Sequence, residues 1–97
     1  MANNKYPNRL WIARKNRGLK QKSVARRLGI ENEAQISLYE TGRVSPKLDT
    51  ALTLSAIYGI SVNDLYKPLF EQIKRKVGRV ETTVPKTPLP ASRAFYL

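Results

Sequence analysis

Short apolar segments that each stop at a glycine are the feature that most constrains the fold of this chain. Apolar residues recur at helical spacing, but in runs too short for a long helix. The runs end at Gly18, Gly29, Gly42, Gly59 and Gly78, which are all the glycines of the chain. Because glycine commonly follows the last turn of a helix, this punctuation predicts an all-α fold built from short helices.

Five helices are predicted before residue 67. They cover about residues 8–17, 21–28, 33–41, 47–58 and 61–66. Asn8 and Ser61 suit the N-cap positions of the first and the fifth helix. Asn32 can cap the third helix, and Gln35 stands three residues later, where it can complete a capping-box-like pair.

A sixth helix and an extended tail are predicted after these five. Pro68 fits a first helical turn and Gly78 a helix end. The apolar stripe of this helix consists of Leu69, Phe70, Ile73 and Val77. Three prolines between residues 85 and 90 exclude a helix there. We therefore expect a domain over residues 6–67, an additional amphipathic helix over 68–78 and a Pro-containing tail over 79–97.

The charge balance favours a polyanionic partner, with nucleic acid ahead of an anionic membrane surface. Lysine and arginine number 18 against seven acids, which gives a net charge of +11. Nine of the basic residues lie between Lys5 and Arg27, a stretch that contains no acid at all. A protein surface that only faces solvent seldom lacks one sign of charge over so many residues.

The composition argues against an enzyme and against a cofactor or metal site. The chain has no cysteine, which excludes disulfides and thiolate metal ligands. It also has no histidine, so it lacks the residue that most often serves as a general base at neutral pH and as a metal ligand. No apolar run approaches the roughly 20 residues that span a bilayer, so no membrane association is expected. These observations predict a cytoplasmic, nucleoid-associated protein.

A set of motifs between about residues 8 and 66 gives the sharpest indication of function. They are Asn8-Arg9-Leu10, Arg14, Arg17-Gly18-Leu19, Gln21, Val24-Ala25, Leu28-Gly29, Ile36-Ser37, Glu40-Thr41-Gly42-Arg43, Pro46, Gly59-Ile60-Ser61 and Asp64-Leu65. In this order and spacing they resemble the phage-repressor-like (Cro type, xenobiotic-response-element) helix-turn-helix family. The resemblance implies a five-helix DNA-binding domain and a prokaryotic transcriptional regulator, a repressor above all, that binds double-stranded DNA as a homodimer.

The third helix is the predicted reading helix. With Ile36 turned inward, a rotation of about 100° per residue places Ala34, Leu38 and Thr41 outermost, and Gln35 and Ser37 beside them. The resemblance implies that Glu33, Ala34, Gln35 and Leu38 meet base edges or nearby phosphates. Gln35 could read adenine and Leu38 could pack on a thymine methyl group, but Leu38 could equally be a plain exposed leucine or a protein contact.

Phosphate contacts and one structural ion pair complete the expected site. The resemblance implies a phosphate contact for Gln21 at the start of the second helix, with an ordinary solvent-facing glutamine as the alternative. The other expected phosphate contacts are Arg9, Lys20, Ser37, Arg43 and Lys47. The resemblance also pairs Arg14 of the first helix with Glu40 of the third, and this pair would hold the reading helix against the scaffold.

Two departures from the family pattern stand out. The connection from Gly29 to Ile36 is one residue longer than the commonest form, and Glu31 and Glu33 bring negative charge to the end that should face phosphates. Glu33 could instead accept a hydrogen bond from a cytosine amino group, or it could favour the N-terminus of the third helix through the helix dipole.

An alternative function is an antitoxin-like or adaptor protein that holds a protein partner through residues 79–97. It is motivated by the apolar end Phe95-Tyr96-Leu97. RNA binding through charge alone is a third hypothesis, and it is disfavoured because few aromatic residues are available for base stacking.

Overall fold

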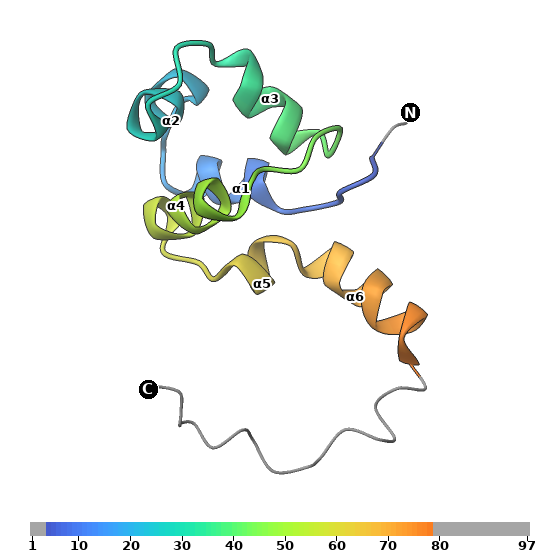
Figure 1. Cartoon of the computed structure of the whole chain (residues 1–97). Helices are drawn as coiled ribbons and strands as arrows, with labels where there is room; N and C mark the ends of the chain where they lie inside the picture. The colour runs from blue at the N-terminus through green and yellow to red at the C-terminus, as the bar shows by residue number, and fades with distance from the viewer. Residues whose placement is uncertain (1–3, 79–97) are drawn as a thin grey trace, which may run out of the picture.

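Six helices make up the secondary structure that the computed structural model describes, which covers residues 4–78 (Figure 1). They are α1 (Leu10–Asn16), α2 (Gln21–Leu28), α3 (Ala34–Glu40), α4 (Leu48–Tyr58), α5 (Val62–Leu65) and α6 (Lys67–Lys76). Over these residues the all-helical fold predicted from the sequence is confirmed. The predicted tail and its protein-docking role lie outside the described residues.

One hydrophobic core joins the first five helices. Its buried members are Leu10, Ala13, Val24, Ala25, Ile36, Tyr39, Leu54, Tyr58 and Leu65. Every helix from α1 to α5 contributes at least one of these side chains. The core therefore fixes α2 and α3 on one side of α1 and α4, while α5 lies on the opposite side (Figure 1).

Polar side chains accept hydrogen bonds from first-turn amides of three helices, but only Ser61 does so from the N-cap position, because Asn8 and Asn32 each precede the N-cap residue. The Asn8 Oδ1 atom accepts from the Leu10 amide at 2.9 Å, and the Ser61 Oγ atom accepts from the Asp64 amide at 3.1 Å. At α3 the Asn32 Oδ1 atom accepts from the Ala34 amide at 2.8 Å, not from Gln35. In the predicted capping box, Asn32 would accept from the Gln35 amide instead. The bond goes to Ala34 because Glu33 already has helical backbone angles, which bring the Ala34 amide closest to the Asn32 side chain.

A tight contact joins the N-terminal segment to the end of α3. The Tyr6 amide donates to the Gly42 carbonyl oxygen at 2.9 Å, and Gly42 has a φ of +77°. A Cβ atom on Gly42 would lie 2.9 Å from the Tyr6 carbonyl oxygen. Glycine at this position thus serves both the left-handed turn and the close approach of the backbone.

The last helix extends away from the domain. α6 packs against α5, and none of its residues is buried (Figure 1). Pro68 lies in its first turn, as the sequence predicts. Within residues 4–78 no helix has the length and the apolar character needed to cross a bilayer.

Candidate nucleic-acid interface

The orientation of α3 is set by two buried side chains. Ile36 and Tyr39 are in the core, where they are 1% and 8% exposed. Ala34 lies exposed at the start of the helix, and Leu38 one turn later is partly exposed. Gln35 and Ser37 are also partly exposed, whereas Glu33 and Thr41 are exposed. The residues expected to read bases are therefore all at least partly exposed, at the start of α3 and one turn into it.

An ion pair between Arg14 and Glu40 ties α3 to α1. The Arg14 Nε atom donates to Glu40 Oε2 at 2.5 Å, and its Nη2 atom donates to Glu40 Oε1 at 3.2 Å. The Nη1 atom donates to the Leu19 carbonyl oxygen at 2.9 Å. Both side chains are more than nine-tenths buried, and the hydrogen bond to Glu40 raises the pKa of Arg14 above its ordinary value. This geometry fixes both the distance and the rotation of α3 relative to α1.

Gln21 joins this ion pair from the start of α2. Its Nε2 atom donates to Glu40 Oε1 at 3.1 Å. The sequence indicated a phosphate contact for Gln21 but not this internal bond. One amide hydrogen and the Oε1 atom of Gln21 stay available for another acceptor or donor. Glu40 thus receives hydrogen bonds from α1 and α2 together, and it holds the three helices in one arrangement.

Asn8 is a further positioning residue that the sequence did not reveal in full. Besides the bond that its Oδ1 atom accepts from the Leu10 amide, its Nδ2 atom donates to the Tyr6 carbonyl oxygen at 2.8 Å and to the Tyr39 carbonyl oxygen at 2.9 Å. The bond to Tyr39 spans 31 residues and reaches a carbonyl group in the last turn of α3, which also accepts from the Gly42 amide at 3.0 Å. No local sequence signal predicts such a long-range acceptor.

Most of the expected phosphate contacts surround α3, but one does not. Lys20 lies exposed at the N-cap of α2, and Arg43 and Lys47 are exposed on the connection that follows α3. Ser37 is partly exposed on α3 itself. Arg9 instead lines a small cleft of about 190 Å³ with Asp64 and Leu65 of α5, and its amide donates to the Leu65 carbonyl oxygen at 2.7 Å.

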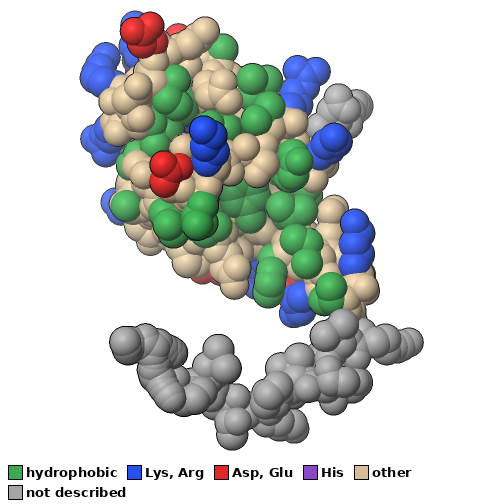
Figure 2. Space-filling view, in the orientation of Figure 1, with side chains coloured by type: hydrophobic (Ala, Val, Ile, Leu, Met, Phe, Trp, Pro, Cys, Tyr) green, Lys and Arg blue, Asp and Glu red, His purple; other side chains and the backbone are tan. Residues whose placement is uncertain are grey.

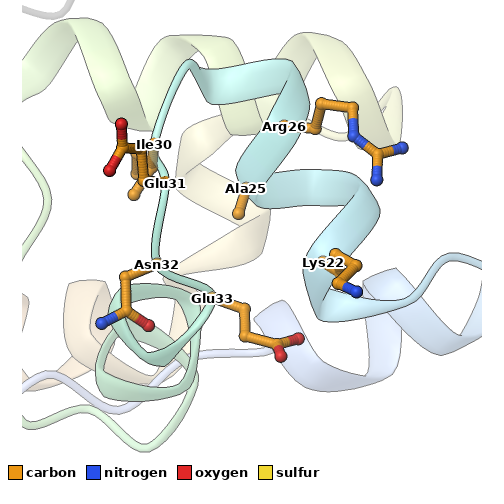
Figure 3. Close-up of a pocket in the computed structure, with 7 residues that line it drawn as sticks. All are labelled: Lys22, Ala25, Arg26, Ile30, Glu31, Asn32 and Glu33. Atoms are coloured by element: carbon orange, nitrogen blue, oxygen red, sulfur yellow. The ribbon is translucent and has the colours of Figure 1, made fainter.

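A wider cleft of about 590 Å³ separates α2 from the connection that leads into α3 (Figure 3). Lys22 and Arg26 line it from α2, and Glu31 and Glu33 line it from the connection. The Glu33 side chain extends toward the side where Lys22 lies, whereas Arg26 points away. The cleft thus has two acids on one wall and two basic residues on the other, and among the described residues no ion pair joins the two walls.

The exposed side of α3 lies between two groups of basic residues. An α-helix with its side chains is about 10–12 Å across, which is close to the roughly 12 Å width of the major groove of DNA. Exposed basic residues lie at the start of α2 and after the end of α3. Figure 2 shows lysine and arginine side chains spread around the upper part of the molecule, the part that holds α2 and α3. The arrangement can place α3 between two rows of phosphates.

Comparisons with known proteins agree with this geometry. A helix-turn-helix family profile matches residues 12–65. A crystal structure of a hypothetical transcription factor, NHTF from Neisseria, is similar with a TM-score of 0.54 and 26% sequence identity, over 68% of this chain and 75% of that one. No curated protein sequence matches the chain significantly.

Proposed function

Because this chain belongs to the helix-turn-helix family of the Cro/C1 type, we propose that it is a sequence-specific transcriptional regulator that reads the DNA major groove with α3. Membership makes it a DNA-binding protein rather than an enzyme. One observation supports the finer proposal above all others. Ile36 and Tyr39 are buried in the core, while Glu33 and Ala34 at the start of α3 face outward.

Four residues read base edges in this proposal. Gln35 recognises adenine through its side-chain amide, and Leu38 packs on a thymine methyl group. Glu33 accepts a hydrogen bond from a cytosine amino group, which accounts for an acid at the DNA-facing end of α3. Ala34 lets the backbone approach the bases because its side chain is small.

The basic and polar residues around α3 bind phosphates. They are Lys20, Gln21, Ser37, Arg43 and Lys47. Gln21 acts while its Nε2 atom stays bonded to Glu40, so the internal bond orients the amide toward the phosphate. We leave Arg9 out of this set because it lies beside α5.

The regulator acts as a homodimer on a palindromic site. A single α3 of seven residues reaches too few base pairs for selective binding, and two copies double the number that is read. Bound over a promoter, such a dimer represses transcription by excluding the polymerase. This mode of action is that of a prokaryotic, nucleoid-associated repressor in the cytoplasm.

Selection of bound sequences from random DNA duplexes tests the proposal. We expect enrichment of a palindrome, and an affinity for it that falls by about a thousandfold between roughly 50 and 200 mM salt if six phosphates are neutralised. A duplex of the same length with the selected bases scrambled is the control. Selection that enriched no sequence at all, even at low salt, would show the proposal to be wrong.

A further inference from the structure

The N-terminal segment, residues 4–8, runs along the C-terminal end of α3. The Tyr6 amide donates to the Gly42 carbonyl oxygen at 2.9 Å. Two residues later in the segment, the Asn8 Nδ2 atom donates to the Tyr39 carbonyl oxygen, also at 2.9 Å. In Figure 1 the start of the segment lies beside the loop that follows α3. Hydrogen bonds at two points therefore fix the position of the segment relative to α3.

The bond between Tyr6 and Gly42 brings two basic residues, Lys5 and Arg43, close together. The Cα atom of Lys5 is two covalent bonds from the amide nitrogen that donates this hydrogen bond. The Cα atom of Arg43 is three covalent bonds from the carbonyl oxygen that accepts it. With standard covalent geometry, these two Cα atoms are therefore no more than about 8 Å apart.

Neither of these cations has a carboxylate partner in the part of the chain that the structure describes. The ion pairs found there are those of Arg14 with Glu40 and of Lys74 with Glu71. Lys5 and Arg43 are both exposed, and the stretch from Lys5 to Arg27 contains no acid. Their two charges therefore attract an anion to the C-terminal end of α3.

We propose that Lys5 binds a DNA phosphate adjacent to the one that Arg43 binds, which makes the N-terminal segment part of the DNA interface. The inference rests on the proposed function, because it adds a contact at the C-terminal end of the reading helix. Consecutive phosphates of one DNA strand are separated by about 3.4 Å along the helix axis. Two long basic side chains that start so close together can reach a pair of them.

The hydrogen bonds to α3 hold Lys5 in place before DNA binds. A segment that became ordered only on binding would lose conformational entropy at that step, which would offset part of its attraction to the phosphate. Asn8 limits this loss, because its Nδ2 atom also donates to the Tyr6 carbonyl oxygen within the segment, at 2.8 Å. We therefore assign Asn8 a positioning role, in which it acts on DNA binding through Lys5.

The first test is the salt dependence of binding to a duplex of random sequence, measured for the full-length protein, Lys5→Ala and Lys76→Ala. Both variants remove one exposed lysine, but Lys76 lies on α6, at the other end of the molecule from α3 (Figure 1). We expect Lys5→Ala to lower the slope of log affinity against log salt by about one, and the affinity by roughly tenfold near 100 mM salt. Lys76→Ala should leave the slope unchanged. Equal slopes for the two variants would overturn the proposal.

This readout needs no selected sequence. A failure of the proposed function, in which selection enriches no sequence, is therefore recognised separately from a failure of the Lys5 contact, in which the slope of Lys5→Ala does not fall.

Uncharged phosphate substitutes locate the contact. The probe is a duplex with a single half-site, that is, one half of the selected palindrome, in which one phosphate at a time is replaced by a neutral methylphosphonate. The unchanged protein should lose affinity wherever it contacts the replaced phosphate. Lys5→Ala should be insensitive at one such position, and Arg43→Ala at the adjacent position on the same strand. Insensitive positions on different strands, or none for Lys5→Ala, would overturn the proposal.

A double-mutant cycle tests the positioning role of Asn8. Asn8→Ser keeps an oxygen that can accept from the Leu10 amide, but its side chain is too short to reach the Tyr39 carbonyl oxygen. In this background we expect Lys5→Ala to lower the salt slope by about half as much or less, because Lys5 is no longer held in place. Chemical unfolding checks that Asn8→Ser is folded under the assay conditions. An unchanged effect of Lys5→Ala in folded Asn8→Ser would overturn the positioning role.

Discussion

Arg14 and Glu40 are 26 residues apart in the sequence, yet they form a two-point ion pair in the interior that fixes α3 against α1. We predict that Glu40→Leu destabilises the protein by about 3–5 kcal/mol, because it leaves a buried guanidinium group without its counter-charge. Urea unfolding measures the change. The double variant Arg14→Met with Glu40→Leu should recover most of the loss, since no unpaired charge is then buried. If the double variant were as unstable as Glu40→Leu, the loss of stability would come from altered side-chain packing and not from an unpaired buried charge.

Arg43 is exposed on the connection after α3, where we place a phosphate contact. Arg43→Ala should weaken binding to all DNA sequences alike and reduce the slope of log affinity against log salt by about one. The matched control is Arg75→Ala on α6, at the other end of the molecule, which should leave the slope unchanged on a single half-site. Equal slopes for the two variants would remove Arg43 from the interface.

Glu31 and Glu33 line the same cleft, but we assign them different effects on DNA binding. Glu33→Gln should change the preferred base at one position from cytosine to adenine, with roughly a tenfold loss on the original site. Glu31→Gln should raise the affinity for every sequence by removing a charge that repels phosphates, and leave the preference unchanged. Repeating the selection with each variant measures both effects. An unaltered preference with Glu33→Gln would contradict its role as a base reader.

The Tyr58 hydroxyl group lies in the core, where burial first and the Glu40 carboxylate second raise its pKa from 10.0 to about 12. The unfolded chain ionises this group near pH 10, so its contribution to stability is complete below pH 10 and is lost as the pH rises through 12. We expect the protein to lose about 3 kcal/mol of stability over this range through Tyr58. Tyr66, whose pKa is also raised to about 12, adds to the loss.

Tyr58→Phe isolates this contribution. Its free energy of unfolding should fall less than that of the unchanged protein between pH 10 and 12, and the difference should match the loss assigned to Tyr58. Urea unfolding at pH 8, where neither state ionises the hydroxyl group, provides the reference. Parallel pH profiles of the two proteins would show that Tyr58 ionises equally in both states.

The local parts of the fold could be predicted from the sequence, because short-range patterns encode them. Gly29 and Gly59 end α2 and α4 with left-handed angles, and the spacing of Ile36 and Tyr39 identifies the inner face of α3. The partnership of Arg14 with Glu40 could be expected only from the resemblance, since a periodic pattern contains no information on partners so distant in sequence.

Bonds that depend on how the helices cross could not be predicted. The amide of Gln21 reaches Glu40 only because α2 and α3 meet at one angle in the folded core. The Asn8 amide reaches Tyr39 because the N-terminal segment runs along the end of α3. Helix propensities and capping rules concern residues that are close in sequence, whereas the acceptors Glu40 and Tyr39 are far from Gln21 and Asn8 along the chain. The surroundings of the candidate site therefore had to come from the structure.

The contact between Gly42 and Tyr6 leads to a last prediction. Gly42 and Gly29 have almost the same backbone angle, with φ of +77° and +75°, but only at Gly42 would a Cβ atom meet other atoms. Gly29→Ala should therefore cost about 1 kcal/mol of stability from the left-handed conformation alone. Gly42→Ala should cost more, by about another 1–3 kcal/mol, because the Cβ atom is forced against the Tyr6 backbone and the side chain of Asn4. It should also weaken DNA binding, since the N-terminal segment that supports the end of α3 is displaced. Chemical unfolding of both variants gives the comparison, and equal losses would mean that the segment moves aside without penalty.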